Sequence, residues 1–422
     1  MWCFGIFIVT LLFGLYGISG LGGGFVFFHF PSAFVELILL LICTGSRIFN
    51  LALLASPLSV LVPVAYLTGP NSKPTQYAWD YAIWGVEKAG PTFIKLIQWA
   101  TTRNDLFSAD FVSKFSTLQD HTRGHSWKDT ERMLTKELGE GYNEIFEFDE
   151  SVEKSKYYRS DPITPVGSGC VAQVYKAKLK QDSNLVPAGT EVAIKVTHPG
   201  ILHKVCVDFY ILNKLTSLLE KIPFLNLDYL SMKDSVEQFR DIMLPQLDLR
   251  VEARNLKRFR KNFSGNPNVA FPAPLDPLTS ANVLVESFVH GDPVMKFVTE
   301  GHRTDREELA KIGLSTVMKM IFLHDFVHGD LHPGNIIVDR NKEAWGSPLR
   351  LNMIDCGLVV EMGEQDHVNL VKVLGAFIKR DGVLAAQLMI DTAKKCQATE
   401  KDMDLFCKGI QQICDDDLEN VS

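Results

Sequence analysis

The sequence predicts an α+β fold preceded by apolar, membrane-embedded N-terminal segments. No Lys, Arg, Asp or Glu occurs before Glu36, and a second uncharged run extends from Ile48 to Ser72. Aromatic and aliphatic residues then recur at helical spacing up to about Tyr158, after which short β-branched runs alternate with helical stretches. The 422 residues are enough for two or three domains with a large buried core.

Two N-terminal stretches are long enough to cross a bilayer, which takes about 20 apolar residues in a helix. They are residues 4–30 and 48–67, within a membrane-associated region 1–69. Glycines weaken the first as a helix, whereas the prolines of the second are tolerated in membranes. A cleaved signal is the alternative for the first stretch, although the positively charged leading region is missing. We expect at least one membrane-embedded segment rather than a wholly soluble chain.

Charge and cysteine usage exclude several classes of function. The net charge is -7 and no Lys/Arg-rich stripe occurs, so nucleic acid is not an expected partner. The 8 cysteines are scattered, without a C-x-x-C pair or histidines at zinc-ligand spacing. We expect reduced thiols in an intracellular or matrix-like compartment, with neither a disulfide framework nor a cysteine metal site.

Strands and helices are expected in a definite order after the first helical region. PVGSGCVAQVYKAKL and TEVAIKVTHPG predict two antiparallel strands, and NVLVESF predicts another after a helical block at about 231–263. A further helix is predicted at about 305–324, with Thr304 and Glu307 spaced as a capping box at its start. The runs IIVD and RLNMID predict a final strand pair.

A glycine-rich turn opens the first of these strands. The turn Gly167-Ser168-Gly169-Cys170-Val171-Ala172 has G-x-G-x-x-A spacing, which lets backbone N–H groups approach phosphate oxygens. Alone this signal is weak, because ordinary tight turns share it. Val192-Ala-Ile-Lys195 follows on the next strand, and a lysine there can reach phosphates under the turn rather than extend from a strand edge into solvent.

A carboxylate falls on the apolar face of the helix within QLDLRVEARNLKRFRKNF. This residue is Glu252, and its helical neighbours on that face are leucine and phenylalanine. A carboxylate in that position is costly unless a cation meets it, and Lys195 is the candidate. The alternative, a surface ion pair with a nearby arginine, suits Asp248 better than Glu252.

The motif HGDLHPGN, residues 328–335, precedes Asp355-Cys-Gly357 by about 20 residues. Asp330 is placed to orient or deprotonate an attacking hydroxyl group, while Asn335 and Asp355 would hold Mg²⁺ against the β- and γ-phosphates. Each motif alone is common, but their order along the chain is that of a kinase site. The sequence therefore predicts a site for ATP and Mg²⁺.

The residues after Gly357 argue against a peptide acceptor. The segment LVVEMGEQDHVNLVKVLGAFIKR has no Ser, Thr or Tyr and no Ala-Pro-Glu motif, whereas a protein kinase uses it as a phosphorylatable platform. Gly329 stands where a protein kinase has an arginine, and HGDLHPGN looks like the loops of aminoglycoside and choline-type phosphotransferases. A small or lipid-like acceptor, or ATP hydrolysis alone, is more consistent.

Together these motifs resemble the UbiB/AarF/ABC1 family of atypical kinases. The resemblance covers about Gly90 to Val360, through GPTFIKLIQWATTRNDLF, PVGSGCVAQVYKAKL, VAIKVTHPG, QLDLRVEARN, HGDLHPGN and IDCG. It implies a protein-kinase-like bilobal fold with an N-terminal helical extension, and ATP binding or hydrolysis that supports coenzyme Q (ubiquinone) biosynthesis at the mitochondrial inner membrane. The implied partners are ATP, membrane lipids and coenzyme Q biosynthetic proteins.

The resemblance also implies domain boundaries. Residues 70–158 would form the helical extension, and 159–422 the kinase domain, with lobes at about 159–290 and 291–422. The adenine would lie against the strand end Glu286-Ser-Phe288. The chain stops 65 residues after Gly357, which is short for a kinase C-terminal lobe and is what a truncated lobe would give.

The extension carries Lys95-Leu-Ile-Gln98, which resembles a family motif that lies over the active site and blocks peptide substrates. Lys95 and Gln98 are therefore the expected gating pair. Ile97 replaces the family's glycine, which bears on close packing over the nucleotide. Gln246-Leu-Asp248 replaces E-x-D, so the ion pair from Lys95 is expected to rest on Asp248.

Two other functions stay open at this point. A small-molecule phosphotransferase would phosphorylate a soluble acceptor. A nucleotide-sensing scaffold without turnover would bind ATP or ADP even after Asp330 is lost.

Overall fold

The computed structural model describes residues 32–102, 107–115, 124–150, 161–182, 186–221, 232–340, 348–393 and 398–416. The chain forms two compact units, Met1–Ser56 and Pro57–Ser422. Helix α2 (Ser32–Ala55) belongs to the first unit, and α3 (Leu58–Thr68) begins the second. Within the described residues, Leu41–Thr68 is the stretch long and apolar enough to cross a membrane, with a mean hydropathy of 2.0. It overlaps the span expected at 48–67, and the span at 4–30 lies outside the described residues.

Short helices dominate the next part of the chain, as the helical spacing predicts. They are α4 (Lys73–Ala89), α5 (Pro91–Thr101), α6 (Ala109–Phe115), α7 (Trp127–Leu138) and α8 (Tyr142–Ile145). Ser72 caps α4 by accepting a hydrogen bond from the Thr75 N–H at 3.3 Å. Gly90, with φ of 101°, turns the chain from α4 into α5, which begins at Pro91.

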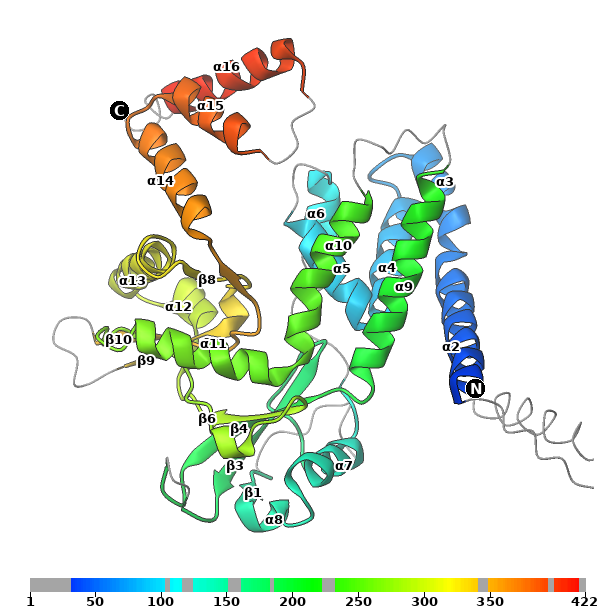
Figure 1. Cartoon of the computed structure of the whole chain (residues 1–422), viewed down its shortest axis with the longest axis vertical. Helices are drawn as coiled ribbons and strands as arrows, with labels where there is room; N and C mark the ends of the chain where they lie inside the picture. Colours follow the sequence, from blue (N-terminus) through cyan, green and yellow to red (C-terminus); the bar gives the residue numbers. More distant parts are fainter. Residues whose placement is uncertain are drawn as a thin grey trace, which may run out of the picture. The chain divides into compact units, whose positions relative to one another are not determined.

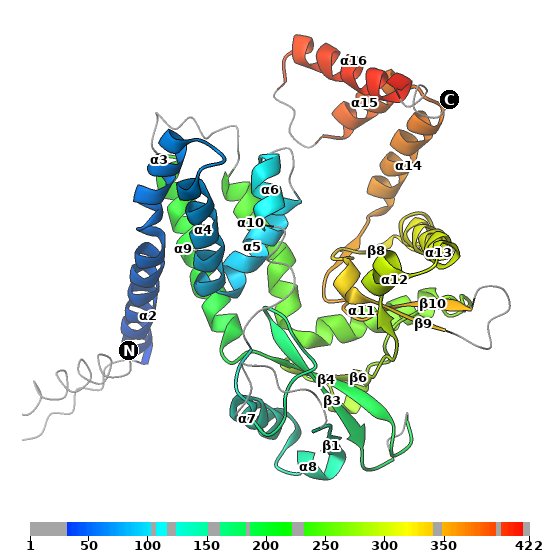
Figure 2. The same cartoon turned by 180° about the vertical axis from the view of Figure 1, so that it is seen from behind.

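A five-stranded sheet follows, in the order β1-β3-β4-β6 with β2 beside β3. Its strands are β1 (Phe146–Phe148), β2 (Gly167–Ser168), β3 (Ala172–Leu179), β4 (Glu191–Thr197) and β6 (Val283–Ser287). The predicted antiparallel pair β3–β4 is confirmed, with Val174 opposite Lys195. Val192, Ile194 and Val196 point into a core that includes Trp127 and Leu134 of α7, so the alternate residues, including Lys195, face the other side. Figures 1 and 2 show α7 and α8 beside this sheet.

The predicted helical block at 231–263 is two helices joined by a 3₁₀ turn at Pro245. After α9 (Ile201–Leu219), the chain forms α10 (Met232–Met243), the turn η4 (Leu244–Leu247) and α11 (Leu249–Asn262). Asp248 caps α11 by accepting a hydrogen bond from the Arg250 N–H at 3.0 Å. Leu249, Leu256 and Phe259 of α11 are buried, which confirms the predicted apolar stripe.

The rest of the chain contains two smaller sheets and five α-helices within the described residues. One sheet has the order β5-β10-β9-β7, and the other pairs β11 with β8. The strands are β5 (Val269–Ala270), β7 (Asp292–Pro293), β8 (Phe326–His328), β9 (Ile336–Arg340), β10 (Leu349–Met353) and β11 (Val359–Glu361). The helices are α12 (Val294–Glu300), α13 (Arg303–Phe322), α14 (Glu364–Ile378), α15 (Gly382–Thr392) and α16 (Glu400–Asp416), with the short 3₁₀ turn η6 (Pro333–Asn335). The α+β class and the predicted pair β9–β10 are confirmed.

The predicted capping box at the start of α13 is wrong. The helix begins at Arg303 after His302, so Thr304 lies inside its first turn. The Glu307 carboxylate accepts a hydrogen bond from Arg303 Nε at 2.7 Å instead. The helix therefore starts two residues earlier than a capping box of Thr304 and Glu307 requires.

Gly291 fixes the passage from β6 to β7, and we expect Gly291→Ala to destabilise the protein by about 2 kcal/mol. Its φ is 146°, and a Cβ there would clash with the Val338 carbonyl of β9. Gly265→Ala is the matched control, because a Cβ at Gly265 meets nothing within 4 Å. Urea unfolding of both variants measures the effect, and equal losses of stability would contradict this account.

Candidate active site

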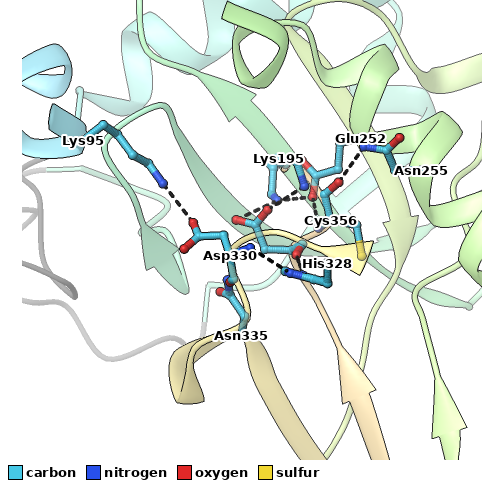
Figure 3. A network of polar contacts seen from close by, with 10 residues as sticks. Lys95, Lys195, Glu252, Asn255, His328, Asp330, Asn335 and Cys356 are labelled. Atoms are coloured by element: carbon cyan, nitrogen blue, oxygen red, sulfur yellow. Dashed lines mark hydrogen bonds and ion pairs between the residues drawn. The ribbon is translucent and has the colours of Figure 1, made fainter. Parts of the chain in front are cut away.

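A buried ion pair joins β4 to α11. Lys195 Nζ lies 2.6 Å from Glu252 Oε1, and both side chains are buried. The expected pairing of Glu252 with Lys195 is therefore confirmed (Figure 3). Lys195 Nζ also lies 3.8 Å from Asp355 Oδ2, just after β10. A buried charge is tolerated only when it is well paired, so Lys195 and Glu252 depend on each other.

The charged groups of this cluster shift one another's pKa values. Burial alone disfavours an ammonium, but Asp355, Glu252 and Glu286 outweigh it and raise the pKa of Lys195. Burial also disfavours the Asp355 carboxylate, yet the Lys195 charge and the Gly357 N–H lower its pKa to about 2. Burial raises the pKa of Glu252 to about 6, against the pull of Lys195. Asp355 therefore carries its negative charge throughout the neutral pH range.

The loop that carries Asp330 is tied to the segment that carries Asp355. The Asp330 N–H donates to His328 Nδ1 at 3.2 Å, and His328 Nε2 donates to the Asp355 carbonyl. Asn335 Nδ2 donates to the Asp330 carbonyl at 3.1 Å, and the Ile354 N–H donates to the Asn335 carbonyl at 3.0 Å. Asp330, Asn335 and Asp355 are thus brought together, as the motif order predicts. Figure 3 shows Asp330 and Asn335 beside His328.

Two residues of this network were missed from the sequence. His328 links the two loops, and Asn255 of α11 donates from Nδ2 to the Cys356 carbonyl at 2.9 Å. The position of His328 two residues before Asp330 was the available signal. Asn255 lies three residues after Glu252 on α11, so helical spacing alone could have placed it near the same segment.

The glycine turn is closed by backbone hydrogen bonds. The Gly169 N–H donates to the Ala172 carbonyl at 2.9 Å, and the His198 N–H donates to the Val171 carbonyl at 2.8 Å. The hydroxyl of Ser168 is buried and has no hydrogen-bond partner. An unpartnered donor in this turn suits a phosphate oxygen.

The residues present fit Mg²⁺ and ATP. The side chain of Asp355 is 48 % exposed, and the nearby Lys195 keeps it ionised. Asn335 uses its Nδ2 for the Asp330 carbonyl, which leaves the amide oxygen available. Carboxylate and amide oxygens suit Mg²⁺, while Lys195 and the glycine turn suit phosphates. Asn335 and Asp355 would hold the metal ion, and Lys195 with the turn would hold the nucleotide.

Lys95 of α5 contacts Asp330, and the prediction that its ion pair rests on Asp248 is wrong. Lys95 Nζ lies 3.1 Å from Asp330 Oδ2 (Figure 3). Asp248 is already satisfied, because it caps α11 and pairs with Arg250 Nη2 at 2.7 Å. Ile97 lies within the same continuous helix, from which Lys95 still reaches Asp330.

The two glutamines expected beside this gate lie on different elements. Gln98 is on α5, one turn after Lys95, and its carbonyl accepts a hydrogen bond from the Thr101 hydroxyl at 2.7 Å. Gln246 is in η4, and its Nε2 donates to the Ile242 carbonyl at 2.9 Å. Lys95 contacts the catalytic loop through its ion pair with Asp330. The gating role of both glutamines stays a prediction.

Glu286 at the end of β6 is a buried carboxyl group. It pairs in register with Ala193, on the same face of the sheet as Lys195, and its Oε2 has no hydrogen-bond partner. Burial raises the pKa of Glu286 to about 8, so it is largely protonated at neutral pH. The ring of Phe288 lies beyond the strand, with Lys176 Nζ 4.8 Å from its centroid. Contact of Glu286 and Phe288 with adenine stays a prediction.

Comparison with known proteins decides the family. The profile of the ABC1 atypical kinase-like domain matches residues 117–389. The chain belongs to this family. The expected kinase-like fold and the resemblance to UbiB/AarF/ABC1 kinases are thereby confirmed.

Curated ABC1 relatives match along most of the chain. A mitochondrial ABC1 family protein of Schizosaccharomyces pombe is 29% identical over 83% of this chain and 58% of its own length. A probable serine/threonine-protein kinase of Dictyostelium discoideum is 30% identical over 87% of this chain and 58% of its own. A probable protein kinase UbiB of Histophilus somni is 31% identical over 78% and 57%. The chain thus spans less than two thirds of the length of these relatives.

A solved structure shares the fold of this chain. It is a Mycobacterium tuberculosis protein in complex with erythromycin, with a TM-score of 0.50 and 20% identity. The match covers 67% of this chain and 64% of that one. At this identity the likeness shows the fold alone.

The protonation of Glu286 gives a pH-dependent prediction. Because its folded pKa is about 8 and its ordinary value is 4.5, the folded state binds a proton that the unfolded state lacks between these values. Stability contributed by this group therefore falls as pH rises from about 5 to 8. We expect Glu286→Gln to remove that loss, by about 1–3 kcal/mol at pH 8 and little at pH 5. Urea unfolding at both pH values tests this, with exposed Glu140→Gln as control. A Glu286→Gln effect equal at both pH values would refute it.

Proposed function

We propose that this protein is an atypical kinase or ATPase of the UbiB type that binds Mg·ATP. The observation that carries the proposal is the 2.6 Å pair of Lys195 with Glu252, 3.8 Å from Asp355. A lysine held by two carboxylates on a rigid strand keeps its charge and its position for the α- and β-phosphates. Asn335 and Asp355 would hold Mg²⁺, which would neutralise charge on the transferred phosphoryl group.

Asp330 would act on the attacking group. Its side chain is 41 % exposed, and its backbone is fixed by His328 and Asn335. It would accept a proton from a hydroxyl group or water that attacks the γ-phosphate. The ammonium group of Lys95 forms an ion pair with this carboxylate, so Asp330 would act on the attacking group only after Lys95 has moved away.

The acceptor is proposed to be small or lipid-like, or water, rather than a peptide. The chain passes from Gly357 directly into β11, which pairs with β8, and α14 begins at Glu364. No room is left for a long substrate platform between these described elements. Position 329 also has no space for an arginine, since a Cβ would lie 2.8 Å from Leu358 Cγ.

The cellular role that we propose is support of coenzyme Q biosynthesis and mitochondrial lipid metabolism, at the mitochondrial inner membrane. The resemblance to UbiB/AarF/ABC1 kinases supports the role, and the name of the Schizosaccharomyces pombe relative supports the mitochondrion. The apolar stretch Leu41–Thr68 supports membrane lipids as partners.

Asp330→Asn tests the proposal in the full chain, held in detergent or cardiolipin-containing nanodiscs. Losing the acid/base group should lower kcat for Mg-dependent ATP hydrolysis by about 100-fold or more, with the Kd for ATP almost unchanged. Lys195→Ala should instead weaken ATP binding. Wild-type binding without turnover would favour a nucleotide-sensing scaffold, and phosphate transfer to a soluble acceptor would favour a small-molecule phosphotransferase. No ATP binding at all would refute the proposal.

The Lys95–Asp330 pair predicts that Lys95 lowers the ATP turnover of the wild-type protein. Partly exposed ion pairs contribute up to about 1 kcal/mol, so Lys95→Met should raise ATP turnover by up to about fivefold. Lys88→Met, at an exposed position near the end of α4, is the matched control and should leave turnover unchanged. Turnover that falls in Lys95→Met would show that Lys95 assists the reaction instead of restraining it.

A further inference from the structure

Two histidines that the proposed function does not use support the glycine turn through the carbonyl of Gly169. His198 follows β4, and its Nε2 lies 2.8 Å from the Gly169 carbonyl oxygen. Its Nδ1 lies 2.7 Å from Nδ1 of His125, which stands just before α7. The two rings meet edge to face, with centroids 5.0 Å apart. A side chain of the helical extension therefore supports the phosphate turn through one intermediate ring.

Only one arrangement of protons satisfies these contacts when both rings are neutral. The Gly169 carbonyl can only accept, so His198 carries its proton on Nε2 and accepts at Nδ1. His125 must then donate from Nδ1 and accept at Nε2, where the Thr130 hydroxyl lies 2.8 Å away. Burial lowers the pKa of His198 and, with the neighbouring His198 ring, that of His125 to about 4. Both rings are neutral at pH 7, as this arrangement requires.

The far end of this chain of hydrogen bonds is fixed in the core. Thr130 is fully buried, and its hydroxyl lies 2.8 Å from the Tyr175 hydroxyl and 3.2 Å from Gln173 Nε2. Gln173 also holds the backbone of His125, accepting from its N–H at 3.1 Å and donating to its carbonyl at 3.3 Å. His125 has little freedom to turn, so it imposes one orientation on His198.

Fixing the Gly169 carbonyl also fixes the next N–H group. In a trans peptide the C=O and N–H bonds point in opposite directions, and the described residues contain no cis peptide. The Gly169 carbonyl points to His198, so the Cys170 N–H points away from His198. Cys170 lies on the catalytic side of the turn, since its thiol interacts electrostatically with Lys95, Asp330 and Asp355. A carbonyl turned to that side would repel phosphate, whereas an N–H attracts it.

We propose that His198, oriented by His125, is a positioning residue that turns the Gly169–Cys170 peptide so that its N–H faces the nucleotide phosphates. This inference rests on the proposed ATP site. It assigns a role to a histidine 29 residues from the turn that it supports, and one to a residue of the extension outside the Lys95 motif.

The test compares ATP with adenosine, because only ATP carries phosphates to the turn. In the full chain, His198→Leu should raise the Kd for ATP about tenfold, as expected for one lost positioning hydrogen bond, and leave the Kd for adenosine unchanged. His125→Leu leaves the hydrogen bond from His198 to the turn in place but removes its orientation, so it should give the same pattern more weakly. His125→Asn keeps a donor in place of Nδ1 and should restore ATP affinity relative to His125→Leu.

Four outcomes would contradict parts of this inference. Equal losses of ATP and adenosine affinity in His198→Leu, or unchanged ATP affinity in both leucine variants, would overturn the positioning role while the ATP site stands. Equal behaviour of His125→Asn and His125→Leu would overturn the part assigned to His125. A wild-type chain that binds neither ligand would overturn the proposed function, and the inference with it.

Discussion

The buried pair of Lys195 and Glu252 is the contact on which the rest of the site depends. It joins the five-stranded sheet to α11, whose apolar stripe packs in a core with Phe271, Leu284 and Met353. Neither charge could remain buried without the other, and removing one partner of such a pair is strongly destabilising. Because α11 also holds the Cys356 carbonyl through Asn255, the same helix that satisfies Lys195 positions Asp355.

The catalytic loop is held mainly by contacts to backbone atoms. His328 and Asn335 both bond to main-chain groups of the loop or of the segment after β10, so neither of them uses the carboxylate of Asp330 or Asp355. His328 thus only supports the loop, whereas Asn335 supports it through Nδ2 and keeps its amide oxygen for a metal ion. Loss of a supporting residue would displace Asp330 without changing its chemistry.

Local patterns predicted much of this arrangement, and contacts between distant segments explain most of the errors. The strands β3 and β4, the apolar stripe of α11 and the Lys195–Glu252 pair follow from periodicity and from the cost of a lone buried charge. The partner of Lys95 did not follow, since it depends on where α5 lies relative to a loop 235 residues away. Asp248 directly precedes α11, so its role as a helix cap could be predicted locally. The comparison with the family motif instead favoured an ion pair of Asp248 with Lys95. His125 and His198 carry no periodic signal, because a hydrogen bond across 73 residues leaves no trace in spacing.

Lys95 and His125, both in the described part of the helical extension, reach the site through contacts of different character. Lys95 meets Asp330 through a partly exposed ion pair, which is weak enough to open and close. His125 meets His198 within a network anchored on the buried Thr130 and Gln173, where an unpaired polar group would be costly. One contact is therefore suited to regulation and the other to support. If α5 moved, Lys95 would release Asp330 while the His125–His198 contact still held the glycine turn. The proposed site would then admit an acceptor while the turn stayed in position for the nucleotide phosphates.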